Sequence, residues 1–181
     1  MKVIGICGSP RRGNTEWMLR KLLDGVAKAG IDTELILLRE RDIKACDGCL
    51  SCEVGGKERK GICSIQDDMQ QIYPKLLEAD GLALGTPVYF EMLSGLLKSF
   101  MDRTCPIWPR LELKPIVGIA VAEESAGKAI ENLRTYASVC GMRWVGQVSV
   151  LAKTPEQVSK DRDVDRRLEL LTRKLIDKLM A

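Results

Sequence analysis

The chain has 181 residues, of which 45% are hydrophobic and 29% charged, and this composition is typical of one globular domain with a substantial core. The formal net charge is only +3 and the basic residues are dispersed, so the sequence does not indicate a nucleic-acid partner. No apolar run approaches the ~20 residues that span a bilayer, and no signal peptide is recognisable. We therefore expect a cytoplasmic protein with no membrane partner.

The counts of cysteine and histidine restrict the chemistry further. There are seven cysteines and no histidine. In a cytoplasmic chain, many cysteines indicate metal binding or redox chemistry before structural disulfides. The absence of histidine excludes mixed cysteine–histidine zinc sites and Ser-His or Cys-His nucleophile pairs. An enzyme of this composition is expected to take its chemistry from a cofactor, and we assign no catalytic side chain.

The first predicted elements are a strand, a helix and a second strand. Residues 2–7 are rich in Val and Ile and predict a buried strand. Asn14 or Thr15 is expected to cap a helix with apolar residues at helical spacing, which ends at Gly30. Residues 32–38 predict the second strand.

A cysteine-rich segment without periodicity interrupts this alternation, which then resumes. Ser64 and Asp67 are expected to cap a helix with apolar positions from Met69 to Leu77. Residues 81–85 predict a short strand that ends in a turn at Thr86-Pro87, and residues 93–101 predict a helix.

The remaining elements complete the pattern. Residues 115–122 form the most hydrophobic run and are expected to be the central strand. A helix is predicted from Ser125, a strand over 144–151, and a terminal helix with buried positions from Val164 to Leu179. Five apolar strands that alternate with helices predict an α/β sandwich with a parallel sheet, which binds ligands at the carboxyl ends of its strands.

The turn after the first strand has the parts of a phosphate-binding loop. Its sequence, GSPRRGNT at 8–15, matches neither the dinucleotide fingerprint nor the nucleoside triphosphate loop. It does combine hydroxyls, guanidinium groups and backbone N–H groups at a helix N-terminus, which suit a monophosphate. The alternative is an ordinary βα turn, since Gly and Ser also favour turns.

Four cysteines lie close together in the run CDGCLSCEVGGKERKGIC: Cys46, Cys49, Cys52 and Cys63. Three interpretations compete: a [4Fe–4S] cluster, a structural zinc ion, or free cysteines. The compact C-x2-C-x2-C spacing is typical of ferredoxin-like cluster sites, whereas zinc loops usually use two separate C-x2-C pairs. For Cys7 and Cys140 we expect ordinary core packing, and Cys105 has no evident partner.

At this point the chain resembles the flavodoxin-like NADPH-dependent FMN reductases and, within them, the iron–sulfur flavoproteins of archaea and anaerobes. The matching segments are GSPRRGNT at 8–15, the cysteine motif at 46–63, DDM at 67–69, EADGLALGTPVYF at 78–90 and SGLLKSFMDR at 94–103. The resemblance implies a flavodoxin-like three-layer sandwich with a five-stranded parallel sheet of order 2-1-3-4-5. We expect a single FMN-binding domain over residues 1–181, with the cysteine loop at 46–63 inserted.

The resemblance also implies two cofactors, FMN and a [4Fe–4S] cluster. For the FMN phosphate it implies Ser9, Arg11, Gly13, Asn14 and Thr15, and for the isoalloxazine ring Pro87, Val88, Tyr89 and Phe90. Residues 122–127 form a third loop that could close over the ring. The cluster ligands would be Cys46, Cys49, Cys52 and Cys63, although the last gap, ten residues, is longer than the family usually has.

These cofactors predict an electron-transfer flavoprotein. Electrons would come from a ferredoxin-like donor and would pass through the cluster and FMN to a quinone, oxygen or peroxide. Lys57, Arg59 and Lys60 are expected to form an ordinary solvated loop, and docking of an acidic electron donor is the alternative. A homodimer or homotetramer is expected. One alternative is an NAD(P)H-dependent FMN or quinone reductase whose cysteine site is empty or holds structural zinc, and another is a redox or metal sensor.

Overall fold

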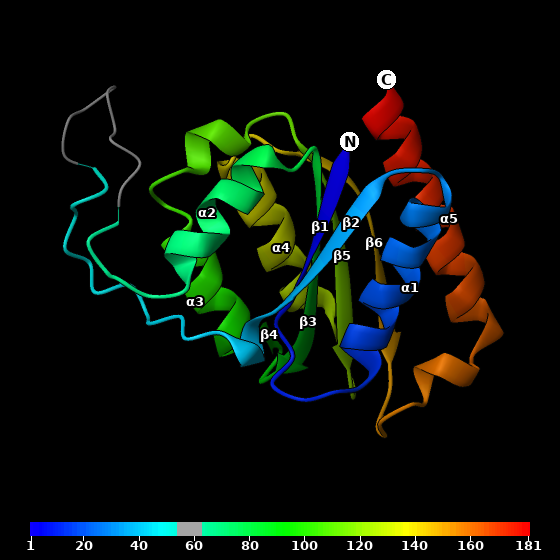
Figure 1. Ribbon diagram of the computed structural model, residues 1–181. Helices are drawn as coiled ribbons and strands as arrows, with labels where there is room; N and C mark the ends of the chain where they lie inside the picture. The colour runs from blue at the N-terminus through cyan, green and yellow to red at the C-terminus, as the bar shows by residue number, and fades with distance from the viewer. Residues whose placement is uncertain (54–62) are drawn as a thin grey trace.

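A computed structural model describes residues 1–53 and 63–181 as a three-layer α/β sandwich (Figure 1). Its central sheet contains five parallel strands, β1 (Lys2–Cys7), β2 (Asp32–Leu37), β3 (Gly81–Tyr89), β5 (Pro115–Ala122) and β6 (Arg143–Leu151). Their order is β2-β1-β3-β5-β6, and the two-residue strand β4 (Met92–Leu93) pairs antiparallel with β3. If this short strand is left aside, the order is the predicted 2-1-3-4-5.

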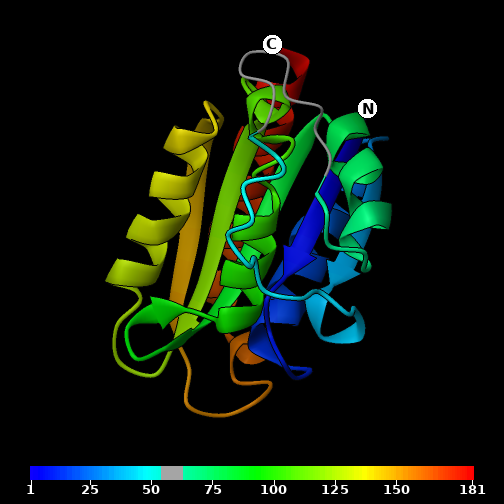
Figure 2. The same ribbon diagram turned by 90° about the vertical axis from the view of Figure 1, so that its left-hand side faces the viewer.

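Helices cover both faces of the sheet and enclose one hydrophobic core on each. One face carries α1 (Asn14–Lys28) and α5 (Arg162–Met180). The other carries α2 (Met69–Glu78), α3 (Gly95–Arg103) and α4 (Gly127–Val139), and this face is turned toward the viewer in Figure 2. Short 3-10 turns lie at Leu38–Glu40, Trp108–Leu111 and Val158–Lys160.

The expectation that residues 115–122 form the central strand is wrong, because β3 lies in the middle of the five strands and β5 lies next to it. All eight residues of β5 are buried, because helices cover it from both sides. The described helices are amphipathic, and none combines the length and apolarity needed to cross a membrane.

The third parallel strand is longer than the sequence predicts. We expected it to end before a turn at Thr86-Pro87, and that expectation is wrong. Thr86 and Pro87 pair with Ala120 and Val121 of β5, and the strand continues through Val88 and Tyr89, which pair with β4. Pairing with β5 therefore keeps β3 extended past Pro87, and the turn lies at Phe90 and Glu91 instead.

The helix starts also differ from the expected caps. Gly13 takes the cap position of α1, and neither Asn14 nor Thr15 caps it. Asp68 holds the cap position of α2, while the Asp67 carboxylate accepts a hydrogen bond from the Met69 N–H at 3.0 Å. These shifts are small, but they leave the N-terminus of α1 without a cap from any described side chain, which matters for the site.

Candidate functional site

A cleft of about 400 Å³ lies at the carboxyl ends of the parallel strands, at the lower edge of the sheet in Figure 1. Four loops form its walls: those after β1, β3, β5 and β6. It brings together every residue predicted to bind the cofactor: Ser9, Arg11, Gly13, Asn14, Thr15, Pro87, Val88, Tyr89 and Phe90. Segments that are far apart in the sequence meet here because parallel strands end at one edge.

One end of the cleft is suited to an anion. Since no described side chain caps the N-terminus of α1, its first N–H groups and the positive end of the helix dipole face the cleft loop. The buried Ser9 hydroxyl donates to the Arg11 carbonyl at 2.7 Å and accepts from the Arg11 N–H at 3.3 Å. Ser9 thus shapes the loop, while the exposed Arg11 side chain remains beside the helix N-terminus.

Asn14 has a structural task that the sequence did not reveal. Its amide Nδ2 donates to the Thr154 carbonyl at 2.9 Å, and its Oδ1 accepts from the Val158 N–H at 3.3 Å. These bonds tie the loop after β6 to the start of α1. The backbone of Asn14, rather than its side chain, is therefore the part that is free to face an anion.

The loop at Ala152–Pro155 lines the cleft and was missed in the sequence analysis. A signal was available, because this loop follows the last parallel strand and every such loop opens at the carboxyl edge. The loop after β5 does line the cleft as expected, through Glu123, Glu124 and Ser125.

The other end of the cleft presents aromatic surface on a constrained turn. Phe90 and Glu91 have φ angles of 49° and 64°, in the left-handed region that residues other than glycine adopt only under constraint. Phe90 is fully exposed and Tyr89 is 42% exposed. Exposed aromatic side chains at the rim of a cleft are suited to cover a planar ring, so the two ends together fit a phosphate linked to an aromatic ring system.

Hydrogen bonds of two buried hydroxyl groups, those of Ser94 and Thr86, connect these two ends of the cleft. The Ser94 hydroxyl donates to the Gly8 carbonyl at 2.7 Å and accepts from the Leu97 N–H at 3.2 Å, capping α3. The Thr86 hydroxyl accepts from the Ser94 N–H at 2.9 Å and donates to the Pro87 carbonyl at 2.7 Å. Both of these hydroxyls are buried, so the phosphate loop and the β3–β4 turn are held in one fixed relation.

The cysteine segment lies outside α2 and α3, on the opposite side of these helices from the sheet (Figures 1 and 2). Cys46 and Cys49 are exposed, Cys52 is half-buried and Cys63 is buried. The Cys49 sulfur lies 3.2 Å from the Ser51 hydroxyl and 3.1 Å from the Ser64 hydroxyl, and these two hydrogen bonds lower the pKa of Cys49. The segment thus folds back so that Cys49 meets the residue after Cys63.

Cys105 has a partner that the sequence did not indicate. The sulfur atoms of Cys52 and Cys105 are 3.6 Å apart. Burial, followed by the hydrogen bond that the Cys52 thiol donates to the Cys105 sulfur, raises the pKa of Cys52 to about 11. A thiol on the turn after α3 therefore stands directly beside one of the predicted metal ligands.

The four predicted ligands share chemistry but do not meet at one point. All four thiols are free, and soft sulfur donors are the ligands that iron–sulfur clusters and zinc require. Among the residues that the structure describes, no group of three or more cysteine or carboxylate side chains is positioned to hold a metal ion. Residues 54–62, with the basic Lys57, Arg59 and Lys60, lie outside the described part of the chain.

Comparison with known proteins assigns the family. The model of the NADPH-dependent FMN reductase family matches residues 1–156, so the chain belongs to that family. It is 46% identical over 123 residues to an iron–sulfur flavoprotein of Methanocaldococcus jannaschii, covering 67% of this chain but 61% of that protein. It is also 31% identical to an iron–sulfur flavoprotein of Methanosarcina thermophila, over 82% of this chain and 79% of that protein.

The fold agrees with this assignment. A flavodoxin from the domain Archaea superposes with a TM-score of 0.67 over the whole of both chains, at 16% sequence identity. The flavodoxin-like three-layer fold expected from the sequence is therefore confirmed.

Proposed function

We propose that this chain is an electron-transfer flavoprotein, which passes electrons between a [4Fe–4S] cluster and FMN. The observation that carries the proposal is the cleft at the carboxyl edge, with an uncapped helix N-terminus at one end and exposed aromatic side chains at the other. Membership of an FMN reductase family and similarity to proteins named iron–sulfur flavoproteins support the same choice.

The residues of the cleft would hold FMN from both ends. Backbone N–H groups at the start of α1, together with Arg11 and Thr15, would bind the phosphate. Val88, Tyr89 and Phe90 would cover the ring and keep water from one side of it. When bound, FMN supplies exchange of one or two electrons, and the protein's contribution is binding, orientation and electrostatics.

The cluster would be held by Cys46, Cys49, Cys52 and Cys63. Of these, Cys63 is buried in the core that includes residues of α2 and α3, whereas Cys46 and Cys49 are exposed. Metal binding often completes the fold of a loop, because the negatively charged thiolates repel one another and are brought together only when the metal binds.

The partners follow from the chemistry of these groups. A ferredoxin-like protein is proposed as the donor of single electrons, and a small acceptor such as a quinone, oxygen or peroxide would reach the solvent-open cleft.

We also propose a homodimer or homotetramer. An apolar groove of about 620 Å³ between α3 and α4 supports this, with the exposed side chains of Met92 and Val139 along it. Analytical ultracentrifugation tests it, and a monomer at all concentrations would refute it.

The decisive experiment is an absorbance spectrum together with iron, sulfide, zinc and flavin analysis of anaerobically prepared protein. The proposal predicts flavin bands and about four iron and four sulfide per chain, since four thiolates hold such clusters. Flavin with about one zinc and no sulfide would refute it.

A second function is favoured by the family description itself, which names an NADPH-dependent FMN reductase. In that case the chain would oxidise NADPH without an iron–sulfur donor, and the cysteine site would be empty or hold structural zinc. Stopped-flow mixing with NADPH separates the two: rapid bleaching of the bound flavin by NADPH alone supports the reductase, and no bleaching supports the electron-transfer protein.

A further inference from the structure

Two cysteine thiols from distant parts of the chain face each other at the cysteine segment, residues 46–63. The Cys52 thiol donates a hydrogen bond to the Cys105 sulfur, and the two sulfur atoms are 3.6 Å apart. These residues are 53 positions apart in the sequence, so tertiary structure, and not a local turn, brings them together. In the described part of the chain, no other two cysteine sulfurs are joined by a hydrogen bond.

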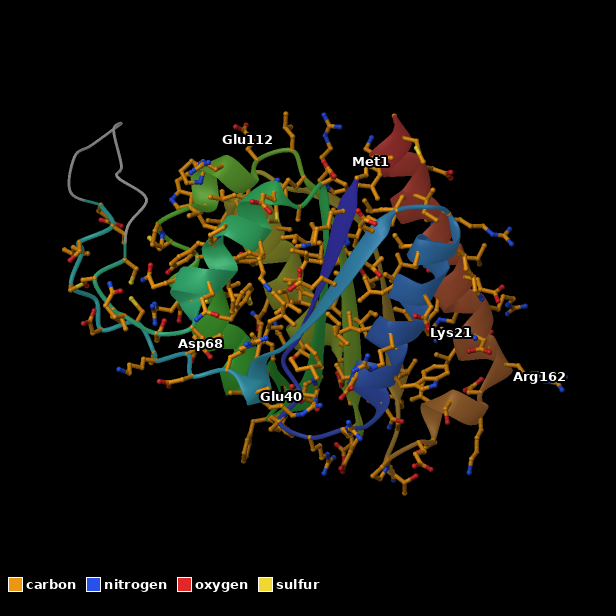
Figure 3. All side chains as sticks on the ribbon, in the orientation of Figure 1. Met1, Lys21, Glu40, Asp68, Glu112 and Arg162 are labelled. Atoms are coloured by element: carbon orange, nitrogen blue, oxygen red, sulfur yellow. The ribbon has the colours of Figure 1, made fainter. Side chains whose placement is uncertain are left out.

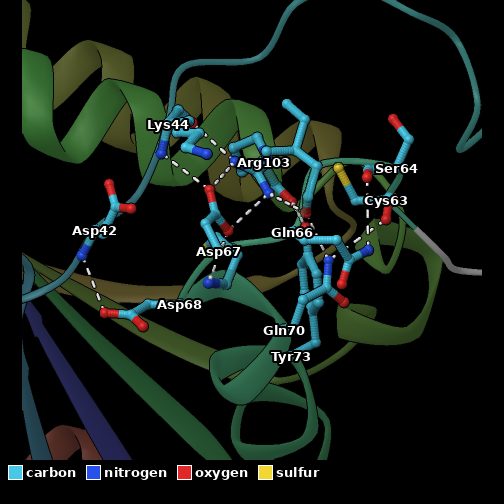
Figure 4. Close-up of polar contacts among 12 residues, drawn as sticks. Asp42, Lys44, Cys63, Ser64, Gln66, Asp67, Asp68, Gln70, Tyr73 and Arg103 are labelled. Atoms are coloured by element: carbon cyan, nitrogen blue, oxygen red, sulfur yellow. Dashed lines mark hydrogen bonds and ion pairs between the residues drawn. The ribbon is translucent and has the colours of Figure 1, made fainter.

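The contact follows from the way in which the cysteine segment is fastened to the end of α3. The Arg103 guanidinium is 1% exposed and contacts the buried Asp67 carboxylate twice, at 2.5 Å and 3.0 Å. It also donates to the Lys44 carbonyl at 2.8 Å and to the Ile65 carbonyl at 3.3 Å. Both stems of the segment are therefore held at Arg103 (Figure 4), and Cys105 follows Arg103 by two residues.

The turn that carries Cys105 is itself held firmly by hydrogen bonds. The Cys105 N–H donates to the Asp102 carbonyl at 3.2 Å. The buried Thr104 hydroxyl donates to the Met101 carbonyl at 2.6 Å and is hydrogen-bonded to the Tyr136 hydroxyl at 3.0 Å. The Cys105 sulfur therefore has a fixed position at the end of α3.

Cys52 lies on the segment that runs outside the helices, where Asp68 marks the start of α2 on the same side (Figure 3). It belongs to no helix or strand, and its turn is closed by a bond from the Glu53 N–H to the Leu50 carbonyl at 2.9 Å. A disulfide bond is about 2.05 Å long, so the two sulfur atoms must approach each other by about 1.5 Å. Cys52 can make this approach without displacing a regular element.

The two thiols are also open to a small reagent. Cys52 and Cys105 are half-buried, whereas Cys7 and Cys140 are enclosed in the core. A thiol that has a second thiol beside it ends its oxidation as a disulfide, because the neighbour captures the sulfenic acid before further oxidation.

We propose that Cys52 and Cys105 are a redox-active pair, which a peroxide oxidises to a reversible disulfide. One thiolate attacks a peroxide oxygen, the O–O bond breaks, the sulfur becomes a sulfenic acid, and the leaving oxygen takes a proton and departs as water or an alcohol. The second sulfur then attacks the sulfenic sulfur and forms the S–S bond, and the sulfenic hydroxyl leaves as water with the second thiol's proton. Two electrons pass from the thiols to the peroxide, and a dithiol reductant returns them.

This inference goes beyond the proposed function and does not rest on it, because a chain that never binds a cluster can form the bond. It adds one consequence. Cys52 is among the four thiols proposed to hold the cluster, so the disulfide would form only while that site is empty.

The test uses the full-length chain, freed of metal with a chelator, fully reduced and then treated with hydrogen peroxide. Remaining thiols are alkylated in denaturant, and tryptic peptides are analysed by mass spectrometry without reduction. Trypsin leaves Cys105 in peptide 104–110 and places Cys46, Cys49 and Cys52 together in peptide 45–57. We expect these two peptides to be joined, in a chain that stays a monomer on a non-reducing gel. Two of the seven thiols should be lost, and dithiothreitol should restore them.

Serine variants identify the partner of Cys105. Cys52→Ser should lose the joined peptides, whereas the matched controls Cys46→Ser and Cys49→Ser should keep them. Cys46 and Cys49 are the more exposed thiols, so a reaction governed by exposure alone would give the opposite order. If Cys52→Ser does not fold, the double variant Cys46→Ser/Cys49→Ser decides, because Cys52 is then the remaining cysteine of peptide 45–57. Joined peptides in it support the inference, and their absence overturns it.

Several results in the wild-type chain would also overturn the inference. These are a disulfide within peptide 45–57 in place of the joined pair, a link between two chains, and oxidation to sulfinic acid without a link. Protein that forms the disulfide but never binds iron and sulfide would refute the proposed function and leave this inference standing, so the two failures are distinguishable.

Discussion

Replacement of Gly8 by alanine tests whether the phosphate loop and α3 are locked together. A Cβ atom at this position would lie 2.7 Å from Leu97 Cβ, 2.9 Å from the Ser94 hydroxyl and 3.3 Å from the Gly85 carbonyl. The first of these atoms is fixed to the helix backbone, so it cannot move aside by changing rotamer. Either α3 or the phosphate loop must shift, and the hydrogen bond from Ser94 to the Gly8 carbonyl is broken.

The cost can be worked out from these contacts. Overpacking a well-filled site costs about 1–3 kcal/mol. A lost buried hydrogen bond adds about 1 kcal/mol, for a total of roughly 2–4 kcal/mol in the free energy of unfolding. In a domain of this size that lowers the melting temperature by about 4–16 °C. Because the loop that moves is the proposed phosphate site, FMN affinity should fall as well.

Thermal unfolding followed by circular dichroism, and flavin fluorescence titration for affinity, measure both effects. The matched control is Gly95→Ala, because Gly95 lies in the first turn of α3 and a Cβ atom added there would meet no atom of the described residues within 4 Å. Alanine is the better helix former, so the control should be neutral or slightly stabilised. A Gly8→Ala protein that has the melting temperature of wild type and binds FMN with the same affinity would refute the reasoning.

Three further changes test other parts of the site. Cys63→Ser should lose most of the iron and sulfide, because a hydroxyl is a poor substitute for thiolate, whereas Cys105→Ser should keep them; equal loss in both would contradict the ligand assignment. Asn14→Ala frees the loop after β6 and should lower stability by roughly 1–3 kcal/mol, measured by urea denaturation; an unchanged midpoint would contradict its anchoring role. Burial alone raises the pKa of Glu16, but hydrogen bonds from two arginines bring it below its usual value. The stability that the ionised Glu16 carboxylate contributes is therefore fully present above its unfolded pKa of ~4.3. This contribution is lost as the pH falls through the lower pKa of Glu16 in the folded protein. Glu16→Gln should flatten the loss of stability below about pH 5, and an unchanged pH profile would count against the ion pairs.

The sequence was sufficient for the fold and for three of the four loops that line the cleft, and the loop after β6 was missed. Hydrophobic runs and helical spacing are local properties, so they predicted β1 and β5 with the bounds that the structure has. The rule that parallel strands open at one edge then placed the loops after β1 and β3 in one site. The resemblance to a flavoprotein family supplied the cofactor that those loops would bind.

Tertiary structure alone decided which side chains serve the site and which hold it together. Asn14 looked like a phosphate ligand, but its amide is engaged by a loop 140 residues later in the chain. Thr86 and Pro87 looked like a turn, but pairing with β5 extended the strand through them. Arg103 and Cys105 gave no local signal, because their partners Asp67 and Cys52 are far away in sequence. Residue types and periodicity are read along the chain, whereas a buried charge or thiol acquires its role only from the groups that folding places against it.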